Sequence, residues 1–194
     1  MRPDRPRVVV HVAVSVDGAT AGFEPDAELF YALASTWGED VTLAGADTIL
    51  AQEEVLADAP RPGPAADGPL LAVVDGRRRV SQWEALRECG HWSDVCALRA
   101  GTVNGRVDLV AALGALRERG AQVVRVDSGG GLNGALLRAR LVDELSLLVH
   151  PCVAGSGRRW WGSSPPESDS LRRLACEPVG VGLVWLRYET REGG

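Results

Sequence analysis

The stretch Val126-Asp-Ser-Gly-Gly-Gly-Leu-Asn-Gly134 decides the fold that this sequence predicts. It follows the valine-rich segment 123–126, which is typical of a buried strand, and it leads into a helical pattern over residues 132–140. The glycines permit a tight turn and a close approach of the backbone between these two elements. The stretch therefore predicts one strand-turn-helix unit of an α/β sheet.

Strands and helices alternate along the chain around this unit. Residues 8–14 are almost all β-branched or apolar, which favours a strand covered on both faces, and residues 41–44 and 70–74 give two shorter strands. Residues 177–189, interrupted by two glycines, predict a closing hairpin. The pattern predicts a mainly parallel central sheet with an antiparallel hairpin at its C-terminal end.

Helices are predicted between these strands. Residues 25–37 carry apolar residues at helical spacing, residues 47–55 are a second expected helix, and residues 81–87 follow a capping-box pattern with Ser81 as the N-cap. The clearest helix begins after Asp108, because its apolar residues repeat at helical spacing and a glycine ends it. The order of elements indicates the α/β class.

Length and composition limit the possible classes of protein. The 194 residues are enough for one well-buried core, so we expect a single domain over residues 1–194. The formal net charge of −5 argues against a nucleic-acid surface, which is normally basic. No run approaches the roughly 20 apolar residues that span a bilayer. We expect a cytoplasmic protein with neither nucleic-acid nor membrane partners.

The cysteines predict no metal centre. Cys89, His91 and Cys96 lie close together, but their spacing matches no zinc pattern. The four cysteines contain no CxxC pair and are typical of reduced thiols.

Glycine corners between a strand and a helix are the candidate phosphate sites. The first turn of the helix after Gly129 has N–H groups without intrahelical partners, which suit a pyrophosphate. The segment Leu43-Ala-Gly-Ala-Asp-Thr48 has the same order of strand, glycine and helix start. Two such corners at the carboxyl ends of parallel strands can bind the phosphates of one dinucleotide. The alternatives are a simple turn for the glycines and helix capping for Asp47 or Thr48.

An arginine cluster, Asp75-Gly-Arg-Arg-Arg79, follows the predicted strand 70–74. A guanidinium binds a 2′-phosphate through two hydrogen bonds, so Arg77 or Arg78 beside an adenosine ribose would favour NADPH over NADH. The alternative is a solvated turn.

Taken in order, these motifs resemble the reductase domain of the riboflavin-pathway pyrimidine deaminase-reductase family. The run Leu132-Asn-Gly-Ala-Leu-Leu-Arg-Ala-Arg-Leu-Val-Asp-Glu144 is the most specific match. The resemblance implies a dihydrofolate-reductase-like fold, NADPH as the hydride donor, a small heterocyclic or ribosylamino-pyrimidine-like substrate, and a homodimer. The matching segments are residues 5–18, 45–50, 73–75, 127–145 and 149–155.

The resemblance also implies roles for single residues. His11, Ser15, Asp17 and Asp127 would line the reaction cleft, and Val14 would lie along the nicotinamide. Asp127 is the first choice for a catalytic group, and His11 is the second because an imidazole can donate a proton near neutral pH. The alternatives are a core histidine for His11 and ordinary turn chemistry for Asp17. The residues expected to bind the cofactor are Val14, Gly45, Ala46, Asp47, Thr48, Arg77, Arg78, Ser128, Gly129, Gly130, Gly131, Leu132 and Asn133.

The sequence differs from the family's usual pattern at positions that bear on which substrate is bound. Asp127 stands where the family usually has glutamate, His11 stands where many members have lysine, and Gln52-Glu-Glu-Val-Leu56 replaces a segment with a phosphate-binding arginine. A lost arginine and two added carboxylates disfavour a phosphoribosyl substrate. A catalytically inactive nucleotide-binding or scaffold dimer is the alternative function. Trp160 and Trp161 fit either a lid over the substrate or a subunit contact.

Overall fold

The computed structural model describes residues 4–155, 157–163 and 171–190. Its contacts divide the chain into two compact units, one formed by Met1–Pro6 and Glu39–Val124 and the other by Arg7–Gly38 and Arg125–Gly194. The prediction of a single domain stays a prediction. Part of the loop predicted at residues 163–170 lies outside the described residues.

The first unit is built on three parallel strands. Strand β2 pairs with β3, and β3 pairs with β4. Its core packs Leu71, Val73 and Leu86 with Leu56 of a neighbouring helix. The elements are β2 (Val41–Gly45), α2 (Ala46–Leu50), α3 (Glu53–Asp58), β3 (Leu70–Val74), α4 (Trp83–Glu88), β4 (Asp94–Leu98) and α5 (Leu109–Glu118).

The sequence predicts some helix ends of the first unit correctly and others incorrectly. The Asp108 side chain caps α5 by accepting hydrogen bonds from two backbone N–H groups, as its sequence pattern indicates. The predicted Ser81 cap is wrong, because α4 has Gln82 at its N-cap and no side chain bonds there. The helix predicted over residues 47–55 is two short helices, α2 and α3, with a turn between them.

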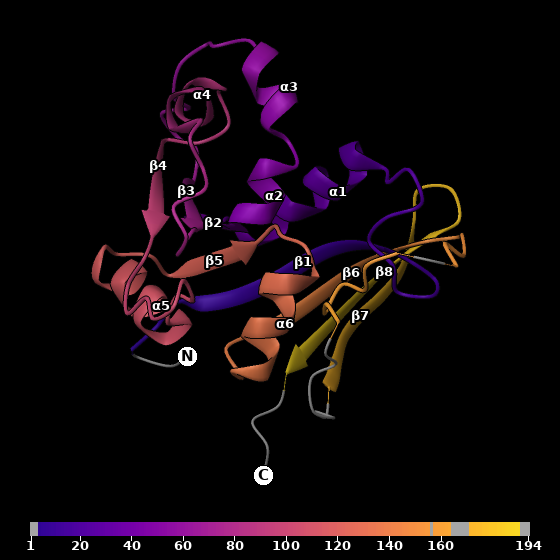
Figure 1. The fold of residues 1–194 in the computed structure, drawn as a ribbon. Helices are drawn as coiled ribbons and strands as arrows, with labels where there is room; N and C mark the ends of the chain where they lie inside the picture. Colours follow the sequence, from indigo (N-terminus) through magenta and orange to yellow (C-terminus); the bar gives the residue numbers. More distant parts are fainter. Residues whose placement is uncertain (1–3, 156, 164–170, 191–194) are drawn as a thin grey trace. The chain divides into compact units, whose positions relative to one another are not determined.

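The second unit combines parallel and antiparallel strands. Strand β1 pairs with β6 in parallel, whereas β8 runs antiparallel to both β6 and β7. Figure 1 shows β7 next to β8. The elements are β1 (Arg7–Ser15), α1 (Ala27–Ala34), the 3₁₀ helix η1 (Ser35–Trp37), α6 (Gly130–Arg138), β6 (Glu144–His150), β7 (Leu171–Val179) and β8 (Leu183–Thr190).

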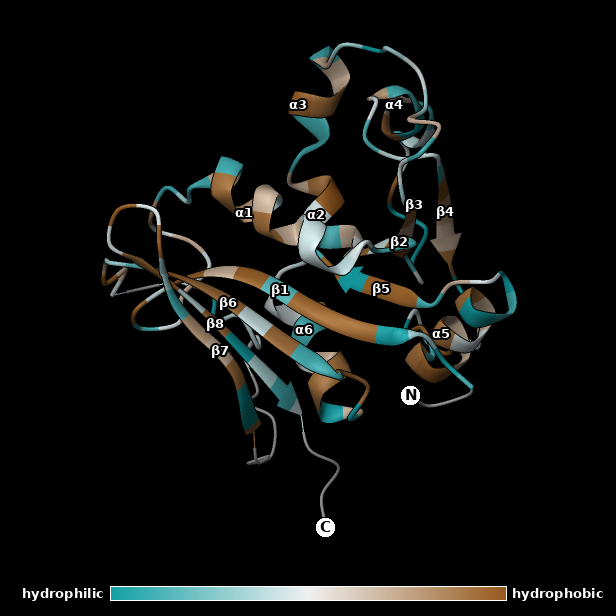
Figure 2. Ribbon diagram, turned by 180° about the vertical axis from the view of Figure 1, so that it is seen from behind, coloured by the Kyte–Doolittle hydropathy of each residue, from teal (hydrophilic) through white to brown (hydrophobic). Residues whose placement is uncertain are grey.

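Strand β1 is buried on both faces, as its continuous apolar sequence predicts. Figure 2 shows it largely in the hydrophobic colour. The helix predicted from Pro25 begins at Ala27, because Asp26 is its N-cap and accepts a hydrogen bond from Leu29 N. The hairpin is longer than predicted, since β7 already begins at Leu171.

A buried carboxylate lies at the start of β6. Glu144 is 1% exposed and accepts hydrogen bonds from Trp37 Nε1 (3.1 Å) and Arg187 Nε (2.6 Å), and it also pairs with Arg7. The Arg187 guanidinium in turn lies over the Trp37 ring. Several donors therefore compensate the desolvation of this charge.

The eight strands follow the order β4-β3-β2-β5-β1-β6-β8-β7, where β5 is Val123–Val126. The fold is thus α/β, with a mostly parallel sheet and a C-terminal antiparallel hairpin, as the sequence predicts. Among the described residues, no helix has the length and apolar character needed to cross a membrane.

Candidate functional site

The glycine corner after β5 has the strand-turn-helix form that the sequence predicts. Gly129 is the N-cap of α6, and the helix begins at Gly130, two residues earlier than expected. A hydrogen bond within the corner stabilises the turn, because Asn133 Nδ2 donates to the Ser128 carbonyl at 2.9 Å. Asn133 is fully buried, and its Oδ1 atom has no hydrogen-bond partner among the described residues.

The glycines of this corner have two different surroundings. A Cβ atom on Gly130 would lie 2.1 Å from the Arg159 carbonyl oxygen, and one on Gly134 would lie 2.1 Å from that of Trp161. These two glycines therefore let the backbone of another segment approach α6 closely. Gly129 and Gly131 are exposed, and a Cβ atom on either would meet nothing within 4 Å. The open space lies at these two residues.

Asp17 is engaged by backbone and side-chain donors. Its Oδ1 accepts hydrogen bonds from the Ser15 hydroxyl (2.7 Å) and Ala154 N (2.9 Å), and its Oδ2 accepts one from Gly155 N (3.2 Å). Arg159 Nη1 lies 3.6 Å from Oδ2. The Ser15 hydroxyl, followed by the backbone N–H of Ala154, lowers the pKa of Asp17.

Asp127 forms a polar group with two neighbours. Arg125 is 5% exposed and its Nη1 lies 3.2 Å from Asp127 Oδ2. The negative charge of Asp127 is the main cause of a raised pKa at Tyr31, and burial adds to it. Tyr31, on α1, is 56% exposed and was not singled out from the sequence. A carboxylate and a phenol thus share the surface beside a buried guanidinium.

His11 occupies the core and has both ring nitrogens engaged. It is 1% exposed and stacks on the Phe30 ring with 4.1 Å between centroids. Nε2 lies 3.0 Å from the Phe30 carbonyl, and Nδ1 lies 2.9 Å from the Ser146 hydroxyl, which itself accepts from Trp185 Nε1. A carbonyl only accepts, so Nε2 carries the proton and Nδ1 accepts from Ser146.

Burial is the main reason why the pKa of His11 falls from 6.5 to about 4, and the positive charge of Arg125 adds to the effect. The imidazole is therefore neutral at physiological pH, with its N–H already donated. This geometry favours the core-histidine alternative over a proton donor. Val14 and Ser15, also expected near the cofactor or substrate, are 2% and 1% exposed.

The second glycine corner has the expected order but different side-chain partners. Gly45 is the N-cap of α2, and Ala46 is buried directly after it. Asp47 forms an ion pair with Arg79 at 2.7 Å, instead of capping the helix. Thr48 is half-buried in the same helix. Arg79 is therefore the member of the arginine cluster that neutralises this corner.

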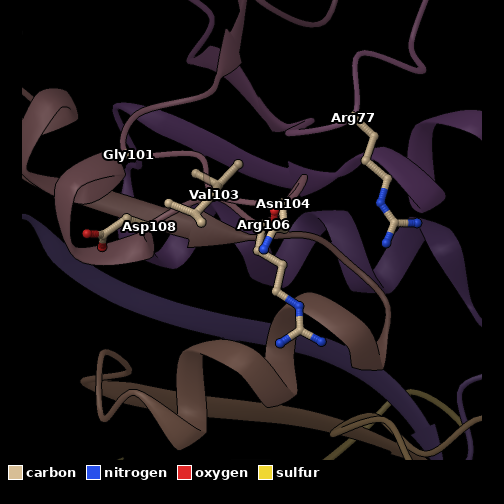
Figure 3. A pocket seen from close by; sticks show the side chains of 7 residues that line it. Arg77, Gly101, Val103, Asn104, Arg106 and Asp108 are labelled. Atoms are coloured by element: carbon tan, nitrogen blue, oxygen red, sulfur yellow. The ribbon is translucent and has the colours of Figure 1, made fainter.

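A pocket of about 670 Å³ lies between the β3–α4 and β4–α5 loops of the first unit. Arg77 comes from the first loop and Arg106 from the second, and Figure 3 shows the two side chains extending toward the same side. Arg78 does not line the pocket; it adopts a left-handed φ of 54° in the turn. The lining residues are Arg77, Gly101, Val103, Asn104, Arg106, Val107 and Asp108.

A tight hairpin presents Arg106 to this pocket. Val103 and Arg106 exchange two backbone hydrogen bonds of 2.9 Å around Asn104 and Gly105. These two central residues have φ values of 50° and 74°, as an Asn-Gly turn of type I′ requires. A Cβ atom on Gly105 would lie 2.8 Å from Arg77 Cγ, so the hairpin packs against the Arg77 side chain.

Sequence reasoning missed Asn104 and Arg106. The Asn-Gly dipeptide is a turn signal, but it does not say which side chain the turn faces. Arg77 and Arg106 line the same pocket because β3 and β4 are parallel neighbours, so the loops after their carboxyl ends lie together.

Comparisons with solved structures support the fold. A Shewanella sp. PV-4 protein, provisionally assigned to riboflavin biosynthesis, shares 20% identity over 96% of this chain and 99% of its own, with a TM-score of 0.69. The riboflavin biosynthesis reductase Rib7 of Saccharomyces cerevisiae shares 18% identity, covering 98% and 92%, with a TM-score of 0.62. Dihydrofolate reductase from Enterococcus faecalis, solved with NADP(H), shares 13% identity, covering 96% and 97%, with a TM-score of 0.58. These likenesses establish a dihydrofolate-reductase-like fold.

Comparison with curated protein sequences gives no match. The family model described as the RibD C-terminal domain matches residues 6–185, which is nearly the whole chain. The chain therefore belongs to the riboflavin-biosynthesis reductase family of the RibD C-terminal domain.

Proposed function

We propose that this protein is an NADPH-dependent reductase. The observation that carries the proposal is the pocket lined by both Arg77 and Arg106, because guanidinium groups suit a phosphate and distinguish NADPH from NADH. The dihydrofolate reductase of similar fold was solved with NADP(H), which supports the same cofactor.

The residues present fit this cofactor. In the first unit, the Arg77–Arg106 pocket has donors for a 2′-phosphate. In the second unit, exposed Gly129 and Gly131 leave the N–H groups of the first helical turn open to a pyrophosphate. Bound NADPH supplies a hydride to the substrate. The protein has to align the two molecules and stabilise the charge that develops.

Asp127 is the proposed substrate-facing group. Its carboxylate is held by Arg125 and retains 29% side-chain exposure, so it can accept hydrogen bonds from an N–H-rich heterocycle. A small heterocyclic or ribosylamino-pyrimidine-like substrate fits such an acceptor. Glu53 and Glu54 open helix α3 where the family's phosphate-binding arginine is expected, which favours a substrate without a phosphate.

Titration of the intrinsic tryptophan fluorescence tests the cofactor. The wild-type protein should bind NADPH more tightly than NADH, and Arg77→Ala or Arg106→Ala should weaken NADPH binding by about tenfold, the size of one charge-assisted hydrogen bond. NADH binding should change little in both variants. Arg61→Ala, which removes an exposed arginine paired with Glu88, is the matched control. Equal loss of NADH binding in the pocket variants would refute the assignment of this pocket.

Reduction of aminouracil ribosyl phosphate and of its dephosphorylated analogue tests the substrate. Turnover that disappears in Asp127→Ala, with folding and NADPH binding retained, would support catalysis. NADPH binding without turnover of either compound would favour the second function, a catalytically inactive nucleotide-binding or scaffold protein.

We also propose a cytoplasmic homodimer. One face of β6, β8 and β7 is apolar. Its half-buried residues are Leu147, Leu186, Val149 and Val184, and Cys176 in the same row as Leu147 and Leu186 is exposed. A second copy of the chain is the proposed partner on this face. Sedimentation should give a dimer for the wild type and a monomer for Leu186→Glu, whereas a wild-type monomer would refute the proposal.

A further inference from the structure

Asp17 ties two loops of the second unit together. One loop, residues 16–20, follows β1, and the other follows β6 and is described over residues 152–155 and 157–162. The Asp17 carboxylate accepts hydrogen bonds from Ala154 N and Gly155 N, and its other near neighbours are Ser15 and Arg159. Because each carboxylate oxygen already has partners within these loops, Asp17 is poorly placed to bind a substrate.

Backbone hydrogen bonds flank this carboxylate on both sides. Val16 N donates to the Cys152 carbonyl at 2.9 Å, and Thr20 N donates to the Arg158 carbonyl at 2.9 Å. Trp160 N lies 3.3 Å from the Gly18 carbonyl. Backbone hydrogen bonds and an isolated bridge between Ala19 and Arg159 therefore join the two loops, and Asp17 joins them nearest the end of β1.

The far end of residues 152–162 rests on the first turn of α6. A Cβ atom on Gly130 would lie 2.1 Å from the Arg159 carbonyl and 2.4 Å from Gly162 N. Residues 159–162 of the loop themselves form a turn, in which Gly162 N donates a hydrogen bond of 2.8 Å to the Arg159 carbonyl. Contacts this close mean that a shift of the loop must move the start of α6 or open a gap beside it.

We propose that Asp17 is a positioning residue for the cofactor corner. Its carboxylate fixes the 152–162 loop against α6, and the loop in turn fixes the Gly129–Gly131 turn in the form that receives a pyrophosphate. The inference rests on the proposed NADPH function for its consequence in binding. The mechanical link from Asp17 to α6 stands without the cofactor.

The variant Asp17→Asn tests the link, because an amide keeps the size of the side chain and removes its charge. Its NH₂ group would face the N–H groups of Ala154 or Gly155, and two donors cannot bond each other. Asp26→Asn is the matched control: it removes the same charge in the same unit, and asparagine caps a helix as well as aspartate does.

Amide hydrogen exchange of the protein without cofactor is the first measurement. In Asp17→Asn, the amides of Ala154 and Gly155, and that of Asn133, which donates to the Gly129 carbonyl at the start of α6, should exchange at least about tenfold faster, a loss comparable to one charge-assisted hydrogen bond. The Asp26→Asn control should leave them unchanged. Faster exchange in the loop alone, with α6 unaffected, would overturn the proposal, as would unchanged exchange in both places.

Steady-state kinetics and NADPH titration are the second measurement. Asp17→Asn should raise the Kd and KM for NADPH about tenfold while kcat at saturating NADPH stays near the wild-type value. A loss of kcat with unchanged KM would overturn the positioning role. If the wild-type protein binds no NADPH, the proposed function fails by itself, and hydrogen exchange in α6 still decides whether Asp17 positions the corner.

Discussion

The neutral, buried His11 predicts a specific dependence of stability on pH. Its pKa is about 4 in the folded protein, because burial disfavours the charged ring, and about 6.5 in the unfolded chain. As the pH falls below about 6.5, the unfolded state binds a proton that the folded state does not. Stability is therefore complete above this pH and is lost progressively down to about pH 4.

The size of the loss follows from these two values. At pH 5 this one proton raises the equilibrium constant of unfolding by a factor of about 30, which corresponds to about 2 kcal/mol of lost stability. At pH 7 the same term is only a few tenths of a kcal/mol. Removal of the imidazole should therefore flatten the stability profile by about 2 kcal/mol between pH 7 and pH 5.

His11→Gln is a suitable variant, because its amide can accept from the Ser146 hydroxyl and donate to the Phe30 carbonyl. Urea unfolding at a series of pH values measures the difference between variant and wild type. His91→Gln, at an exposed histidine, is the control and should keep the wild-type profile. Parallel profiles for His11→Gln and the wild type would refute the burial argument.

Three further predictions concern the neighbouring groups. Gly130→Ala should cost about 1–3 kcal/mol in urea unfolding because its Cβ would meet backbone at 2.1 Å, whereas Gly131→Ala should cost less than about 1 kcal/mol. The pKa of Tyr31, raised by the carboxylate of Asp127, should fall toward its ordinary value in Asp127→Asn, as followed by ultraviolet titration; an unchanged pKa would contradict the pairing. Glu144→Ala should cost about 3 kcal/mol or more in urea unfolding, since it leaves several donors without their shared acceptor; a loss below about 1 kcal/mol would contradict this account.

The order of strands and helices could be predicted because burial leaves a local pattern. Strand β1 is mostly apolar between its polar ends, and Asp108 precedes an apolar helical repeat. The partners of single side chains could not be predicted in this way. Arg106 lines the same pocket as Arg77 only because β3 and β4 are parallel neighbours. His11 is neutral mainly because the fold buries its ring, and Phe30 and Ser146, which bond its two nitrogens, are brought to it by other elements.

The spacing of the glycines in residues 129–134 distinguishes those that pack against backbone from those that a ligand can approach. Gly130 and Gly134 are four residues apart, so they lie on the same face of α6, and this face meets the backbone of residues 159–162. Gly129 and Gly131 fall outside that spacing and face open space. Two small residues at helical spacing thus predict a close backbone contact, and the remaining glycines are the ones a ligand can approach. The case for a phosphate at this corner therefore rests on two glycines and the helix start, and substitutions of Gly130 report on loop packing instead.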